Sequence, residues 1–207
     1  PDDVPPPYHR TEVVSCCGCG LMQQKYLPDY DQFKRYFYRS GVSATMANHL
    51  RHVADELSEM LLVTGVKSSD LQLLDIGGND GTLLSYFPSS NGRLVIDPSD
   101  VPNKYSTINR IVGFFPQDMR GRDGVFDAIM TIACFYDFFD PKAVAQAVAS
   151  RLSRHGLWCV EVADMIPLGY RSAYDYWCSE HVALYSASQI RMVAESAGLK
   201  IVRVEQS

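Results

Sequence analysis

The pattern with the most chemical content is a run of glycines and short polar residues that directly follows an apolar segment. The run is LDIGGNDG at positions 74–81, and Asp97 ends the next apolar segment. Glycines let a backbone turn sharply and approach a ligand closely, while an acidic residue at the end of the second strand accepts hydrogen bonds from a ribose diol. The pattern therefore predicts a nucleoside-binding corner, the alternative being an ordinary strand-turn-helix connection.

The polar side chains of this corner discriminate between nucleoside ligands. A dinucleotide needs glycines that hold a pyrophosphate at a helix N-terminus, whereas Asp75, Asn79 and Asp80 repel phosphate and suit a cationic amino acid. S-adenosylmethionine (SAM) carries a ribose, an ammonium group and a sulfonium, and no phosphate. We expect Asp97 to bind the ribose, the two glycines to approach the methionine part, and Asp75 and Asn79 to order it. The donor-binding residues expected at this corner are Asp75, Gly77, Gly78, Asn79, Asp97 and Pro98, with Asp118 as a candidate for the adenine amine.

A second chemically apt pattern is the neighbouring pair Glu180 and His181. A histidine with an ordinary pKa of about 6.5 accepts or holds a proton near neutral pH, and an adjacent acid orients its ring. The alternative is a polar loop whose histidine caps the helix that follows Ser186.

The six cysteines predict a reduced protein with a half-formed metal site. Cys16 and Cys19 form a Cys-x-x-Cys pair, but tetrahedral zinc needs four ligands. His9 is the nearest further candidate, and Cys17 could replace a neighbour. The alternative is a turn of reduced cysteines that remains from an ancestral zinc module and binds no metal. The other cysteines are scattered rather than evenly spaced, which favours a reducing, cytoplasmic compartment.

Around these residues, strand-like and helix-like segments alternate. The predicted strands are 71–76, 93–97, 126–132, 156–162 and 200–205, and the predicted helices are 30–38, 43–65, 82–87, 140–152 and 188–197. Residues 1–30 read as loop. The alternation predicts an α/β fold with a mostly parallel sheet covered by helices on both faces.

Composition narrows the classes of function. The chain has 207 residues and 46% hydrophobic residues, enough for its own core, and no apolar run approaches the length of a membrane span. Its net charge of −5 argues against wrapping a long nucleic-acid backbone. A small molecule or a cap nucleotide is the expected partner.

Several stretches together resemble one enzyme family. They are CCGCGLMQ at 16–23, YFYRSGVSATM at 36–46, DIGGNDGTLL at 75–84, GFF at 113–115 and YDYWCSEHVALYS at 174–186. They resemble the SAM-dependent C-methyltransferases of nucleotide-linked deoxysugars, which have Rossmann-like class I methyltransferase domains. The resemblance implies SAM as methyl donor, Glu180 and His181 near the transferring methyl, Tyr38 and Ser40 closing the SAM pocket, and residues 16–23 as half of a zinc knuckle.

From this resemblance we expect three parts. Residues 1–30 are a Cys-rich, zinc-knuckle-like segment, residues 31–66 a helical lid, and residues 67–207 the SAM-binding domain. The first zinc pair and the C-terminal domain of the family lie outside the given sequence, which is consistent with a piece of a longer protein.

Two departures from the family bear on the methyl acceptor. Cys178 stands where the family usually has a tyrosine, and Asp137 where it often has a histidine. A neutral nitrogen needs no base, and Asp137 with Glu180 would suit its developing cation. We therefore prefer guanine N7 of an RNA cap, as in mRNA capping, and keep a sugar-nucleotide carbon as the alternative. An O- or N-methylated natural product and a catalytically silent SAM-fold binding module also remain open.

Overall fold

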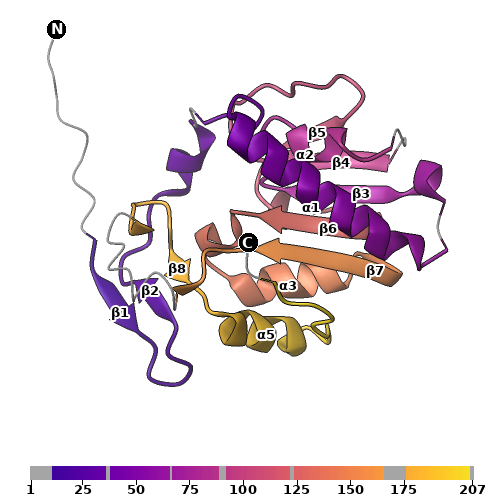
Figure 1. Cartoon of the computed structure of the whole chain (residues 1–207). Helices are drawn as coiled ribbons and strands as arrows, with labels where there is room; N and C mark the ends of the chain where they lie inside the picture. The colour runs from indigo at the N-terminus through magenta and orange to yellow at the C-terminus, as the bar shows by residue number, and fades with distance from the viewer. Residues whose placement is uncertain are drawn as a thin grey trace, which may run out of the picture.

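A parallel sheet of five strands organises the chain, in the order β5-β4-β3-β6-β7 (Figure 1). The computed structural model describes residues 11–35, 38–65, 67–88, 92–121, 124–165 and 176–205. The strands of this sheet are β3 (Gln72–Ile76), β4 (Gly92–Asp97), β5 (Asn109–Val112), β6 (Phe126–Ile132) and β7 (Leu152–Glu161). The α/β prediction is confirmed, although β5 was not anticipated, because four residues show too little periodicity.

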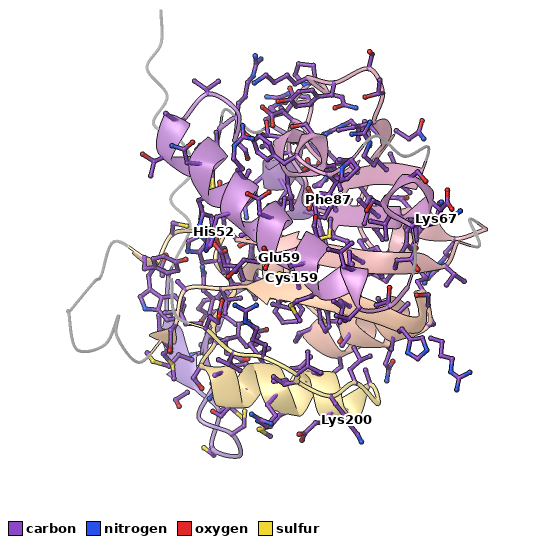
Figure 2. The ribbon with its side chains drawn as sticks, turned by 45° about the vertical axis from the view of Figure 1, so that its right-hand side comes forward. His52, Glu59, Lys67, Phe87, Cys159 and Lys200 are labelled. Carbon is purple, nitrogen blue, oxygen red and sulfur yellow. The ribbon has the colours of Figure 1, made fainter. Side chains whose placement is uncertain are left out.

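Helices cover both faces of this sheet, also as predicted (Figure 1). Leu50 and Leu61 of α1 belong to the apolar cluster on one face, and Val144 of α3 belongs to the cluster on the other. Cys159 of β7, labelled in Figure 2, packs against the α1 cluster. The helices are α1 (Ala44–Leu62), α2 (Thr82–Ser85), α3 (Pro141–Ala149) and α5 (Ala187–Ser196). Short 3-10 helices are η1 (Tyr30–Lys34), η2 (Ser68–Asp70), η3 (Gln117–Met119) and η4 (Phe135–Asp137).

The N-terminal segment departs from the predicted loop. It forms a hairpin of β1 (Val13–Ser15) and β2 (Met22–Gln24), and β2 also pairs with β8 (Ala183–Leu184) from the far end of the chain. Strands of two or three residues carry no readable alternation, because most of their order comes from pairing with distant residues. This small sheet lies beside the carboxyl ends of β6 and β7 (Figure 1).

Three other predictions are corrected. The helix expected at 30–38 is the shorter η1, and Asp29 rather than Asp31 caps it by accepting the Asp31 N–H at 3.0 Å. The helix expected to end at residue 152 ends at Ala149, and β7 begins four residues earlier than predicted. Residues 200–205 form no strand; instead Arg203 pairs with Glu56 of α1 at 3.0 Å.

No helix in the part of the chain that the structure describes is long and apolar enough for a membrane span.

Candidate functional site

The glycine corner follows β3, and its backbone has no room for side chains. Gly77 has a φ of +70°, and a Cβ there would lie 2.9 Å from the Cys134 sulfur. A Cβ on Gly78 would lie 2.6 Å from Oδ2 of Asp75. Because β3 lies between β4 and β6, the chain changes direction in the sheet here, and open α/β sheets bind ligands at that point.

Asp97, at the end of β4, is bound into this corner by several donors. Its Oδ2 accepts the Asn79 backbone N–H at 2.8 Å, and its Oδ1 accepts the Ser99 N–H at 2.8 Å and the Ser99 hydroxyl. Nη2 of Arg110 lies 3.3 Å from Oδ1, while Nη1 donates to the Asn79 carbonyl. The carboxylate is therefore oriented before any ligand arrives.

Arg110 is a residue that our sequence reasoning missed. It lies on β5 opposite Val95 and donates to the Ser99 carbonyl at 3.1 Å as well as to Asp97. The signal in the sequence is a single cationic residue next to apolar ones within 109–112. Because no strand was predicted there, this residue could not be placed beside Asp97.

Asn79 links the segment before α1 to the corner. Its side-chain amide donates to the Tyr38 carbonyl at 3.0 Å, and its Oδ1 accepts the Ser40 N–H at 3.1 Å. Asp80 also connects this segment to the start of α2, because its oxygens accept the Gly41 N–H and the Thr82 N–H and hydroxyl. Asn79, Tyr38 and Ser40 thus come together although about forty residues separate them along the chain.

Asp75 lies beneath the corner with 2% of its surface exposed. Burial raises the pKa of its carboxyl well above the ordinary range, and the nearby Asp97 and Asp80 raise it further. Asp75 does not line the cavity that opens at the carboxyl ends of β3, β4 and β6.

A cavity of about 430 Å³ opens at the carboxyl ends of β3, β4 and β6. The predicted residues that line it are Tyr38, Ser40, Gly77, Asn79, Asp97, Pro98 and Asp137, whereas Gly78 does not line it. Its aromatic wall comprises Tyr30, Phe33, Phe114, Phe115, Tyr136, Phe138 and Phe139. Asp118, expected at the adenine, does not line it; its Oδ2 accepts the Phe114 N–H at 2.7 Å, and Gln117 lines the cavity instead. The cavity thus joins a polar corner to an aromatic slot.

The wall opposite the corner contains Asp137, of η4. Its Oδ1 is buried and has no hydrogen-bond partner among the described residues. Burial raises the pKa of Asp137 well above the ordinary range; Glu180 and Cys178 raise it further, while His181 acts in the opposite direction. Asp137 lines the cavity, and burying one of its oxygens without a hydrogen-bond partner costs free energy.

His181 lies behind this wall rather than on it. Its ring is 4.4 Å from the Tyr136 ring, centroid to centroid, and its Nδ1 lies 2.7 Å from the Tyr176 carbonyl oxygen. Burial lowers the pKa of His181, but Cys178, the Tyr176 carbonyl and Asp137 outweigh it and leave the pKa raised. Neither His181 nor its neighbour Glu180 lines the cavity formed by the described residues, which do not include 166–175.

The His181 ring also affects the pKa of the Cys178 thiol. Burial raises the pKa of its thiol, but hydrogen bonds from the His181 ring and from the N–H groups of Glu180 and His181 outweigh burial, so the pKa is lowered. Cys178, His181 and Asp137 therefore form one electrostatic group.

The Cys16–Cys19 turn does not supply a complete zinc site. The Cys19 and Gly18 N–H groups and the Cys19 side chain lower the pKa of the Cys16 thiol, as a metal-binding turn would require. Yet no three His, Cys, Asp or Glu side chains form a group that could hold a metal ion within the described ranges. His9, the third expected ligand, lies outside the described residues. The described residues therefore do not fit four-coordinate zinc.

Known proteins with related sequences are methyltransferases. A family model described as "Methyltransferase domain" matches residues 46–204. C-methyltransferase NovU of Streptomyces niveus is 27% identical over 202 residues, covering 93% of this chain and 47% of that protein. The chain thus spans about half the length of this curated relative.

Solved structures agree on the fold. The plantazolicin methyltransferase BpumL, solved with a pentazolic desmethylPZN analogue and S-adenosylhomocysteine (SAH), is 18% identical with a TM-score of 0.58, over 72% of this chain and 63% of that chain. A methyltransferase in complex with the Trm112 activator of Haloferax volcanii is 19% identical with a TM-score of 0.58, over 75% of this chain and 74% of that chain. At such identities the likeness concerns the fold alone.

Proposed function

We propose that the chain, which belongs to the methyltransferase domain family, is a SAM-dependent methyltransferase that methylates a carbon atom of a nucleotide-linked sugar. The observation that carries this proposal is that Asp137 lines the cavity with a buried Oδ1 that has no partner among the described residues, and that His181 lies close behind it. A carbon acceptor needs such an acid–base group, and a nitrogen lone pair does not.

The corner after β3 is the proposed donor side. Asp97 would accept hydrogen bonds from the ribose hydroxyls, and Gly77 with Asn79 would line the methionine part. The buried Asp75 would lie beneath the donor without lining the cavity. When bound, SAM supplies a methyl group bonded to a positively charged sulfur. Tyr38 and Ser40 would close this side, because Asn79 holds their backbone.

Asp137 is the proposed proton acceptor on the other side. A carbon next to a carbonyl group becomes a nucleophile when it loses a proton, which would pass to the carboxylate of Asp137. The new carbon–methyl bond forms as the sulfur–methyl bond breaks, leaving SAH. The raised pKa of Asp137 suits this task, because such a carboxylate holds a proton more readily than an ordinary one. His181, close to the carboxyl, would stabilise its ionised form.

The carbon acceptor has better support than the guanine N7 that sequence reasoning preferred. NovU is a C-methyltransferase by name, and the resemblance described above is to enzymes of nucleotide-linked deoxysugars. None of the relatives reported above is named as a cap methyltransferase. The aromatic slot beside the corner also suits the flat base of a sugar nucleotide.

The proposal is tested with SAM labelled in its methyl group, offered with either a keto-sugar nucleotide or a short capped RNA. We expect label on the sugar carbon, with turnover at least about 100-fold lower in Asp137→Asn and SAH affinity unchanged within about twofold. Asp100→Asn is the matched control, since Asp100 is exposed and does not line the cavity. Label on guanine, retained in Asp137→Asn and His181→Ala, would overturn the proposal.

A further inference from the structure

The turn that carries His181 is held by glutamine side chains from the N-terminal segment. Nε2 of Gln24 donates to the Cys178 carbonyl at 2.7 Å and to the His181 carbonyl at 2.9 Å. Nε2 of Gln32 donates to the Ser179 carbonyl between them at 3.3 Å. Three of the four carbonyls in residues 178–181 therefore accept from side chains about 150 residues earlier in the chain.

Gln24 is built into this place rather than lying loosely against it. Only 6% of its surface is exposed, and its backbone N–H donates to the Val182 carbonyl at 2.8 Å. The neighbouring strand residues pair in register, Gln23 with Ala183 and Met22 with Leu184. Both side-chain N–H groups of the amide are thus used, and an apolar side chain would leave two carbonyls without these partners.

The 178–181 turn contacts the cavity wall that contains Tyr136 and Asp137. The Val182 N–H donates to the Tyr136 carbonyl at 2.9 Å, and the His181 ring contacts the Tyr136 ring. Tyr136 and Asp137 in turn line the cavity. A shift of the 178–181 turn would therefore move His181 relative to Asp137 without touching the donor corner.

We propose that Gln24 is a positioning residue that sets the place of His181 behind Asp137, so that the β1–β2 hairpin acts as a brace for the acceptor side of the site. This proposal rests on the proposed function for its catalytic consequence. The hairpin itself does not line the cavity. Its contribution passes through the two carbonyl contacts and the β2–β8 pairing.

The test compares Gln24→Leu and the isosteric Gln24→Glu, which loses the donor N–H groups, with Gln23→Leu on the same strand. Gln23 is exposed, so this control makes the same change on the opposite face. We expect turnover to fall at least about tenfold in both Gln24 variants, while SAH affinity changes less than about twofold and Gln23→Leu behaves as wild type. A parallel loss of SAH affinity, or wild-type turnover in Gln24→Leu, would overturn the proposal.

A second readout needs no acceptor. The His181 ring is titrated by NMR, its signal assigned from the spectrum of His181→Ala; the groups facing it are Cys178, Asp137, Tyr136, Tyr176 and Glu180. In the Gln24 variants we expect the raised pKa of His181 to move toward its ordinary value of about 6.5, because the Cys178 and Tyr176 contacts relax. An unchanged His181 titration would contradict the role of Gln24. Absence of turnover in the wild-type protein would contradict the proposed function alone, and the titration would still decide the role of Gln24.

Discussion

At the scale of single residues, two carboxylates on the cavity wall are in opposite environments. Asp97 accepts from Asn79, Ser99 and Arg110, so its charge is compensated before ligand binding. Oδ1 of Asp137 has no partner in the described part of the chain, and burial raises its pKa. A compensated carboxylate suits permanent hydrogen bonding to a ligand, whereas an uncompensated one suits the gain and loss of a proton.

The uncompensated charge of Asp137 predicts a pH-dependent gain in stability for Asp137→Asn. A carboxyl whose pKa is higher in the folded than in the unfolded state stabilises fully below the unfolded pKa, about 4, and loses this contribution as pH rises through the folded pKa. The variant lacks that loss, so its melting temperature should exceed the wild-type value increasingly from about pH 4 upward and then level off. Thermal unfolding from pH 4 to pH 8 measures this difference. A difference that shrinks with rising pH would show that Asp137 is not destabilised by its charge.

At the scale of elements, α1 connects the core to the segment that closes the donor side. The Oγ of Ser43 caps its first turn by accepting the Met46 N–H at 3.3 Å, and Leu50, Leu57 and Leu61 bury its apolar stripe. On the far side of the sheet, Asp140 caps α3 by accepting the Ala143 N–H at 3.0 Å. The position of Tyr38 and Ser40 therefore depends on a well-anchored helix that begins four residues later.

Two adjacent leucines near the end of α1 test how the helix is anchored. Leu61 is 1% exposed and Leu62 is 64% exposed. We expect Leu61→Ala to lower the free energy of unfolding by about 2–5 kcal/mol, because it leaves a cavity against the sheet. Leu62→Ala, the matched control, should change it by less than about 0.5 kcal/mol. Urea denaturation measures both, and equal losses would show that α1 does not pack as described.

At the scale of the whole molecule, two sheets contribute to one site. The parallel sheet supplies the proposed donor corner at the carboxyl ends of its strands, and the small β1-β2-β8 sheet supports the turn that carries His181. Because β8 and β2 come from opposite ends of the chain, the acceptor side forms only when the chain has folded around the parallel sheet. The proposed donor corner, by contrast, is built by the parallel sheet and the segment before α1.

Ligand binding should therefore raise the stability of the entire domain. At a SAH concentration 100 times its Kd, linkage contributes about 2.7 kcal/mol, which for a chain of this size is a rise in melting temperature of about 5–10 °C. ATP at the same concentration should give no rise, because the corner presents the oxygen atoms of Asn79 and Asp97 rather than a row of free N–H groups to a phosphate. Asp97→Ala should lose most of the rise with SAH, since the ribose contact is lost, whereas Asp100→Ala should keep it. Differential scanning fluorimetry measures all four conditions, and a rise with ATP equal to that with SAH would contradict the proposed donor site.

Features of the fold and of the candidate site could be predicted from the sequence where residues close together in the chain determine them. The α/β fold and α1 follow from patterns within a few residues: apolar runs, a period of 3.6, and a capping serine. The glycine corner with Asp97 was readable for the same reason, because a turn that excludes side chains and a strand that ends in an acid are local features. The roles of these residues at the donor remain predictions.

Only the tertiary structure decided which distant residues support the site. Nothing local marks Arg110 as the partner of Asp97, or Gln24 as the support of the His181 turn, because each is an ordinary polar residue whose partners lie far away in sequence. The hairpin is too short to show a period, and residues 200–205 have the composition of a strand but no strand to pair with among the described residues. Local sequence determines where the chain turns and which faces are apolar, whereas hydrogen-bond partners and buried charges are determined by packing between segments that meet only in the folded state.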